Sequence, residues 1–222
     1  MANGGPAAGP MSSYSRVQLL HLMQTRARRT IAELCAGTGL HQNTVRGHLN
    51  KLLEGGYIVE ETEQRTTRGR PRMFYSAATG APDASSAVAR EKVNQAARRG
   101  DLMRRVMPPT ASRLGIDATH QLDALTEHLE ESGFEPVIDD SALTVDLSAC
   151  PHVAQRTADD RTRCAVHLGL IQGVLTEAGG PLVADCVRAS ATQIECTVQL
   201  RVDPQHAAQG DARGSGAMGT RR

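Results

Sequence analysis

The side chains best able to do chemistry are four cysteines and a nearby histidine in the second half of the chain. Cys164 and His167 are three residues apart, a spacing that places two side chains on one side of a helix. Two cysteines lie on the two arms of an expected hairpin, and a turn near residues 189–192 would bring them roughly opposite each other. Four thiols can therefore converge: Cys150, Cys164, Cys186 and Cys196.

A convergence of thiolates predicts a soft-metal site, because thiolates select iron–sulfur clusters, zinc or copper(I) over hard cations. The thirteen residues between Cys150 and Cys164 differ from the close Cys-x2-Cys pairs of a zinc ribbon. Plain burial is the alternative. Cys164 shares an apolar stripe with Ile171 and Val174, and a fifth cysteine, Cys35, is expected in a helical core. The spacing alone leaves both interpretations open.

The distribution of charged residues divides the chain into a basic and an acidic part, which suggests two domains with different functions. Residues 11–79 carry ten Lys or Arg against five Asp or Glu, and residues 114–202 carry five against fourteen. Only Lys51 and Lys92 among the 25 basic residues are lysine, and arginine suits bidentate contacts with phosphate and guanine. No apolar run approaches the ~20 residues that cross a bilayer, and residues 1–10 lack the pattern of a signal peptide. We expect a cytoplasmic protein with no membrane partner.

Two short helices around a glycine-containing turn are predicted over residues 30–58. Thr30 and Glu33 have the spacing of a capping box at the start of the first helix. In the second helix Val45, Leu49 and Leu52 recur at helical spacing, and glycines end it after Glu54. This is the layout of a helix-turn-helix, whose second helix enters the major groove. Its base-reading candidates are Gln42, Asn43, Thr44, Arg46 and His48, because Gln and Asn can pair with adenine and Arg with guanine.

The residues that follow predict a β-wing. Strands are expected at 57–64 and 72–77, around an arginine-rich tip in which Gly69 and Pro71 shape the turn. Such a tip reaches phosphates or the minor groove, and its candidate contacts are Arg68, Arg70 and Arg72.

The fold class expected is α+β: an N-terminal winged helix-turn-helix and a C-terminal α+β domain with a small antiparallel sheet. Helices are expected at 87–107 and around Leu122–Leu129, and a long helix marked by residues from Cys164 to Leu175 is expected to end at Gly179-Gly180. Strands are expected at 134–138, 142–147, 182–189 and 193–202. The expected divisions are disordered tails at 1–10 and 203–222, a DNA-binding domain at 11–79, a connector and dimerisation helix at 80–113, and a cysteine-containing sensor domain at 114–202.

The segments "TVRGHLNKLLEGGYI" and "RGRPRMFYSA" resemble winged-helix regulators of the ArsR/DeoR type. The strand ending in "CP", the cysteine fourteen residues later, the segment "HLGLIQGVL" and a late strand cysteine resemble the C-terminal domain of SufR-like regulators. The resemblance extends from about Ser15 to Val202. It implies a dimeric repressor that binds a double-stranded DNA operator and senses a 4Fe–4S or 2Fe–2S cluster.

By this resemblance, Cys150, Cys164 and Cys196 correspond to cluster ligands, and Cys186 to an additional cysteine of some members. The fourth ligand stays open between Cys186, His152, His167 and an acidic residue such as Asp159, because the sequence departs from the pattern at His152 and between the last two cysteines. His167 is expected to be a core or supporting histidine.

Two rival functions remain on the residues alone. The first keeps the DNA reader and replaces the cluster by zinc, a thiol–disulfide switch or a small organic ligand. The second is a thiol enzyme with Cys164 as nucleophile and His167 as base. It lacks an orienting third group and an oxyanion site, and it leaves the winged helix unexplained. We therefore expect a regulator and no enzyme.

Overall fold

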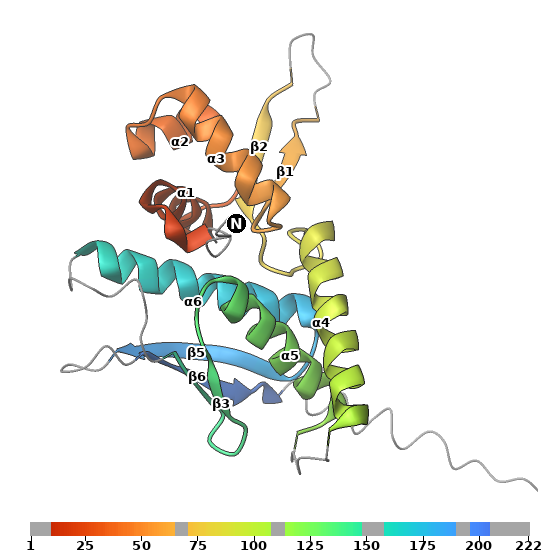
Figure 1. The fold of residues 1–222 in the computed structure, drawn as a ribbon. Coiled ribbons are helices and arrows are strands. Elements are labelled where there is room, and N and C mark those ends of the chain that lie inside the picture. Colours follow the sequence, from red (N-terminus) through yellow and green to blue (C-terminus); the bar gives the residue numbers. More distant parts are fainter. Residues whose placement is uncertain (1–9, 65–70, 108–113, 148–157, 190–195, 205–222) are drawn as a thin grey trace, which may run out of the picture.

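The computed structural model describes residues 10–64, 71–107, 114–147, 158–189 and 196–204. A helical domain with a two-stranded hairpin lies at the top of Figure 1, and a helix-and-sheet domain lies below it. The described part of the chain has the expected α+β class, with both expected sheets antiparallel. Most residues of the two tails expected to be disordered lie outside the described residues.

The N-terminal domain contains the predicted helix-turn-helix and hairpin, preceded by a further helix. A short 3-10 turn η1 (Pro10–Ser12) leads into α1 (Tyr14–Thr25), α2 (Ile31–Thr38), α3 (Gln42–Glu54), β1 (Ile58–Thr62) and β2 (Met73–Ala77). β1 and β2 pair antiparallel, with Ile58 opposite Ala77 and Thr62 opposite Met73. The helix-turn-helix and the hairpin predicted from the sequence are therefore confirmed.

Local signals set the helix boundaries in this domain. The Thr30 hydroxyl accepts from the Glu33 backbone N–H, and the Glu33 carboxylate accepts from the Thr30 backbone N–H, which completes the predicted capping box. Gly39, with φ of 71°, ends α2 in a left-handed conformation that glycine adopts at no steric cost. α3 is held by one apolar face, since Val45, Leu49 and Leu52 are at most 1% exposed.

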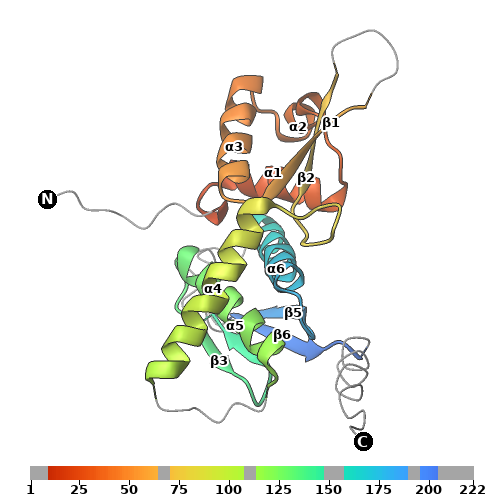
Figure 2. The ribbon, with the colours of Figure 1, turned by 90° about the vertical axis from the view of Figure 1, so that its right-hand side faces the viewer.

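Helix α4 (Ala87–Val106) runs along the edge of the molecule and packs against α5 (Ile116–Glu131) (Figure 2). Ion pairs join the two helices along their length. Arg104 makes a two-pronged contact with Asp123 at 2.9 and 2.8 Å, and Lys92 contacts Glu131 at 2.7 Å. The predicted connector helix is confirmed as a helix.

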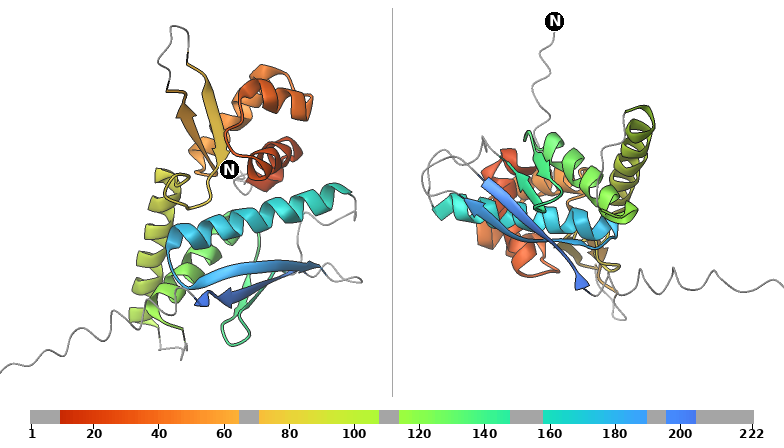
Figure 3. Two further views of the ribbon diagram at one scale, coloured as in Figure 1. Left: turned by 180° about the vertical axis from the view of Figure 1, so that it is seen from behind. Right: turned by 90° about the horizontal axis from the view of Figure 1, so that it is seen from below.

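The C-terminal sheet contains β3 (Val137–Asp139), β4 (Thr144–Asp146), β5 (Leu182–Ala189) and β6 (Cys196–Val202), in the order β3-β4-β6-β5. Helices α5 and α6 (Ala158–Ala178) cover one face of this sheet, as the two further views show (Figure 3). The core between them combines Leu125 and Leu129 of α5 with Val198 and Leu200 of β6. The predicted strands and the final hairpin are confirmed.

Helix α6 belongs to the cores of both domains. Val166 and Leu170 are buried with the side chains of α1 and α3 in the N-terminal core. Ile171 and Leu175 point into the C-terminal core. The Gln24 amide of α1 also donates to the Val166 carbonyl at 3.2 Å. A movement of α6 therefore acts directly on the helix-turn-helix.

Candidate functional site

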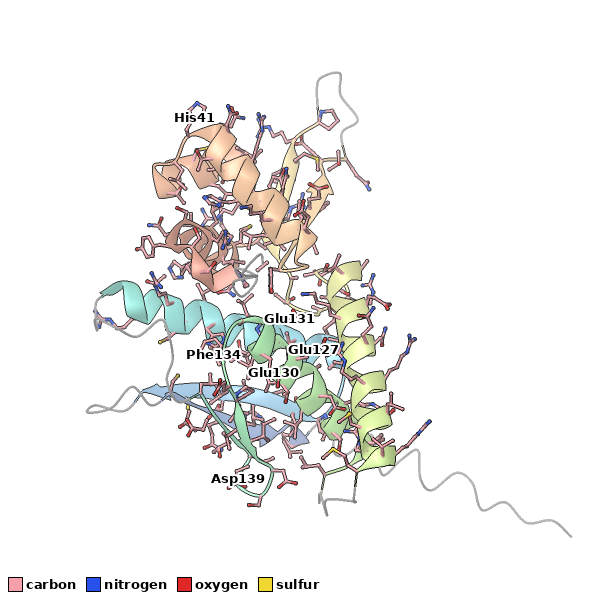
Figure 4. All side chains as sticks on the ribbon, viewed as in Figure 1. His41, Glu127, Glu130, Glu131, Phe134 and Asp139 are labelled. Carbon is pink, nitrogen blue, oxygen red and sulfur yellow. The ribbon has the colours of Figure 1, made fainter. Side chains whose placement is uncertain are left out.

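The N-terminal turns of α3 form an exposed polar surface. The predicted base readers Gln42, Asn43, Thr44 and Arg46 are all exposed, whereas Val45 between them is fully buried. Figure 4 shows His41, at the start of α3, at the end of the molecule furthest from the C-terminal domain. The end of the β1–β2 hairpin at which Thr62 pairs with Met73 points the same way (Figure 1). One end of the domain thus carries both elements that a winged helix presents to DNA.

The fifth predicted reader, His48, sits differently. It is only half-exposed, and burial, with the nearby charges of Arg16 and Lys51, lowers its pKa below the ordinary value. The outward face continues instead through Gly47 and Asn50, which are both exposed. Asn50 lies four residues after Arg46 and therefore on the same face of the helix. Sequence analysis missed Asn50, although its amide has the chemistry of a base reader.

Gly47 leaves an open position at the centre of the exposed face. A Cβ atom built there would meet nothing within 4 Å. Glycine in a helix interior costs roughly 0.5–1 kcal/mol relative to alanine, and the fold gives no packing reason for it here. The absence of a side chain lets another surface approach the α3 backbone closely.

The wing is described only at its base. Arg72 is exposed, and its backbone pairs with Glu63, whose N–H donates to the Arg72 carbonyl at 2.8 Å. The other predicted wing contacts, Arg68 and Arg70, lie outside the described residues. Within the part of the chain that is described, Arg46 and Arg72 form no ion pair, so both guanidinium groups are available to an anion.

Other arginines of this domain serve the fold. Arg26 pairs with Glu33, and Arg28 pairs with Glu61 while its guanidinium lies 4.5 Å from the centroid of the Phe74 ring. Arg29 exchanges two backbone hydrogen bonds with Tyr75, at 2.9 and 2.8 Å, and so adds a bridge beside β2. Backbone and hydroxyl donors of Thr30, with Arg26, lower the pKa of Glu33 to about 2. These contacts lock the segment between α1 and α2 onto the wing.

Three of the four candidate ligand cysteines are described. Cys164 lies in α6 and is half-buried, Cys186 lies in β5 and is half-buried, and Cys196 begins β6 at 4% exposure. Cys150 and the alternative ligand His152 lie outside the described residues, and so does the side chain of Asp159. Within the described residues, no group of three or more His, Cys, Asp or Glu is placed to hold a metal ion.

The strand register corrects the expected placement of the last two cysteines. Cys196 pairs with Ala189 and Cys186 pairs with Gln199, so the two cysteines are not opposite each other. Three residues separate Cys186 from Ala189, and alternate residues point to opposite faces of a strand. Cys196 faces the core with Val198 and Leu200. Cys186 therefore points to the other face of the sheet.

The start of α6, which contains Cys164, and the start of β6, which is Cys196, lie at the same end of the C-terminal domain (Figure 1). The Leu147 N–H donates to the Cys196 carbonyl at 2.7 Å, so the chain leaves the sheet toward Cys150 beside Cys196. Helix α6 begins at Ala158, six residues before Cys164. Cys150, the first candidate ligand, lies outside the described residues.

His167 is a core residue. It is 4% exposed, and its ring stacks on Phe134 with the centroids 4.7 Å apart and an interplanar angle of 12°. A ring held in this way, one turn from Cys164, has little freedom to approach a substrate. Cys35, expected in a core, is partly buried against the N-terminal core.

Comparison with known proteins identifies the first domain. Residues 13–59 match the family model of bacterial regulatory proteins of the arsR family, from just before α1 into β1. The match indicates a DNA-binding transcription regulator and supports the ArsR-type resemblance; it does not reach the cysteine-containing domain. No curated protein and no solved structure matches the chain. No helix in the described ranges is long and apolar enough to cross a membrane.

Proposed function

We propose that this protein is a dimeric, sequence-specific transcriptional repressor whose operator affinity depends on an iron–sulfur cluster held by C-terminal cysteines. The DNA-binding part rests on one observation above all. The first turns of α3 expose Gln42, Asn43, Thr44 and Arg46 while Val45 anchors the helix in the core. These side chains match the donors and acceptors of adenine and guanine in the major groove.

Substitution of two arginines distinguishes contacts with bases from contacts with phosphate. We assign guanine reading to Arg46, on α3, and phosphate binding to Arg72, at the base of the wing. An operator selected from random DNA should bind Arg46→Ala about 1–3 kcal/mol more weakly, with relaxed preference at one base pair. Arg72→Ala should weaken all sequences alike and reduce the salt dependence by about one counterion. Arg201→Ala, an exposed arginine of β6, is the control and should bind like wild type. Equal losses for all three variants would contradict the assignment.

The C-terminal half of α4 carries the surface that we assign to a second copy of the chain. Leu102, Met103, Val106 and Met107 are 59%, 48%, 72% and 56% exposed, and they recur at i, i+1, i+4 and i+5 on one side of the helix. A helix-turn-helix dimer reads two half-sites about one DNA turn apart. Val106→Glu should give a monomer in analytical ultracentrifugation. Val137→Glu, on the equally exposed β3, should stay dimeric, and a monomeric wild type would refute this surface.

The donor set fits an iron–sulfur cluster in part. The start of α6, which contains Cys164, and the start of β6, which is Cys196, lie at one end of the domain, and thiolates are the ligands that such clusters prefer. Cys186 points to the other face of the sheet, so the register favours another group as the fourth ligand. A bound cluster would supply sensitivity to iron supply and to oxidants.

Helix α6 provides the physical link from this end to the DNA-binding domain. Cys164 lies two residues before Val166, which is packed in the N-terminal core and accepts from Gln24 of α1. A constraint on the first half of α6 therefore bears on α1, against which α3 packs. This route is direct and does not pass through α4.

Anaerobic purification with visible absorption and iron and sulfide analysis tests the sensor. Cys150→Ser, Cys164→Ser and Cys196→Ser should each lose the colour and the iron. Cys35→Ser, in the N-terminal domain, is the matched control and should keep both. A colourless, zinc-loaded wild type, or colour retained in every variant, would overturn the cluster proposal.

A further inference from the structure

A cavity of about 60 Å³ lies where the two domains meet. Its walls come from residues 55–57 at the end of α3, from the segment after β2, and from α4, α5 and α6. Glycines let these elements approach closely: a Cβ at Gly80 would lie 2.4 Å from the Glu177 nitrogen, and one at Gly173 would lie 2.9 Å from the Ala78 oxygen. One water molecule, which has one non-hydrogen atom, needs about 10–15 Å³ of cavity volume. The cavity therefore has room for about four to six non-hydrogen atoms.

Acidic side chains outnumber basic ones in the lining. Glu127, Glu131 and Glu177 face the cavity together with Lys92. Glu131 is paired with Lys92 at 2.7 Å, and Glu127 is paired with Arg99 at 3.1 Å. Figure 4 shows Glu127 and Glu131 where α5 approaches α4.

Glu177 differs from the other two carboxylates. Its Oε1 accepts from the Ser85 hydroxyl at 2.8 Å. Its Oε2 is buried and has no hydrogen-bond partner within the described residues, and Glu177 forms no ion pair there. A buried acceptor without a hydrogen-bond partner costs free energy, and a ligand that brings a donor to it would remove that cost.

His128 supplies a second buried polar atom without a partner. The residue is 8% exposed, lines the same cavity, and has no hydrogen bond to Nε2 among the described residues. The centroid of its ring lies 6.3 Å from that of Tyr57 and 6.4 Å from that of His167. Burial lowers the pKa of His128 to about 4, so the imidazole is neutral near pH 7 and can offer a lone pair.

We propose that this cavity binds a small organic cation, an alkylammonium of about four or five non-hydrogen atoms. Its ammonium group pairs with the Glu177 carboxylate, beside the neutral His128 imidazole, and its apolar chain lies against Val93, Leu170 and Val174, which line the same space. A cation is favoured over an anion because Glu177 is the one lining carboxylate that no cation neutralises among the described residues.

The site also connects the ligand to the DNA-binding domain. Its walls include residues 55–57, which directly follow α3, together with α5 and α6 of the C-terminal domain. The other end of α3 carries the base-reading residues. A ligand that binds both domains changes the free energy of their arrangement, and operator and ligand then affect each other's affinity reciprocally. That consequence rests on the proposed function, whereas binding of the cation itself does not.

Titration of the full-length protein with n-butylamine hydrochloride at about pH 7.5, by calorimetry and by NMR of the His128 imidazole, tests the site without DNA. A five-atom ligand binds at best with a Kd of about 3 μM, so the titration extends to about 50 mM. We expect saturable binding with a shifted His128 resonance. Binding of 1-butanol should be at least about tenfold weaker, and sodium butyrate should not bind.

Glu177→Gln keeps the size and the Ser85 contact and should weaken butylammonium binding at least about tenfold. Glu135→Gln, an exposed glutamate after α5, is the control and should bind like wild type. Equal binding of the alcohol and the amine, equal losses in the two variants, or no saturation would each overturn the proposal. An unchanged melting temperature of Glu177→Gln confirms that the variant is folded.

Discussion

Gln121 is the buried residue whose replacement should most damage the C-terminal domain. It is 1% exposed in α5, and its amide makes three hydrogen bonds to main-chain groups. The NH2 group donates to the Leu175 carbonyl at 2.8 Å and to the Leu182 carbonyl at 2.9 Å, and the side-chain oxygen accepts from the Leu182 N–H at 2.7 Å. Gln121 thereby ties α5 to the end of α6 and to the start of β5.

Gln121→Leu removes all three bonds and leaves buried main-chain groups unpaired. A net loss of about 1 kcal/mol per bond, with the added cost of the unpaired groups, gives a destabilisation of about 3–5 kcal/mol. This is a large part of the 5–15 kcal/mol that stabilises a typical domain. Urea unfolding followed by circular dichroism measures the change, provided that the m-value is unaltered.

Gln172→Leu is the matched control for this experiment. Gln172 also reaches a main-chain carbonyl of β5, that of Ala184 at 3.2 Å, but it lies on the exposed side of α6. Its replacement should cost at most about 0.5 kcal/mol. If the two variants lose equal stability, the assignment of Gln121 as the link between three elements is wrong.

Three further outcomes are expected from single substitutions. Burial holds the pKa of His128 at about 4, below the ~6.5 of an unfolded histidine. The stability that the neutral imidazole contributes to the fold is therefore complete above pH 6.5 and is lost as the pH falls toward 4. Between about pH 7.5 and about pH 4.5, the free energy of unfolding of the wild type should fall by about 2–3 kcal/mol more than that of His128→Gln. Equal changes in the two proteins would count against this. Gly47→Ala should raise stability by about 0.5–1 kcal/mol and weaken operator binding, and unchanged binding would show that this face of α3 does not contact DNA. The largest cause that lowers the pKa of Glu33 to about 2 is the hydrogen bond from the Thr30 backbone N–H. The ionised carboxylate therefore stabilises the fold above about pH 4.5, and this stabilisation is lost as the pH falls toward 2. Glu33→Gln should therefore flatten the acid limb of the stability profile, and a superimposable limb would refute the capping role.

Local signals in the sequence predicted most of the fold. Thr30 and Glu33 predicted the start of α2. The spacing of Val45, Leu49 and Leu52 predicted α3 and its buried face. Alternating apolar residues predicted the two hairpins. The exposed base readers followed from the same periodicity, because a position that is not on the buried face of a short helix must face outward. The match to the arsR family model agrees with this part of the prediction.

Contacts between distant segments could not be predicted in the same way. Periodicity marks Ile171 and Val166 as apolar but does not tell that they enter two different cores. Gln121 reads as a polar surface residue, because its partners lie more than 50 positions away. The offset between Cys186 and Cys196 depends on where the hairpin turns, and a shift in that position changes which face a side chain occupies.

The most direct test of the proposed function is the operator affinity of one anaerobic preparation, measured before and after the cluster is removed by chelation. Coupling between two sites typically changes affinity by about 5–150-fold, and the cluster-bound form should bind the operator more tightly. The same treatment of Cys164→Ser should leave its affinity unchanged, at the weaker value. Equal affinities of the wild-type protein before and after cluster removal would contradict the account.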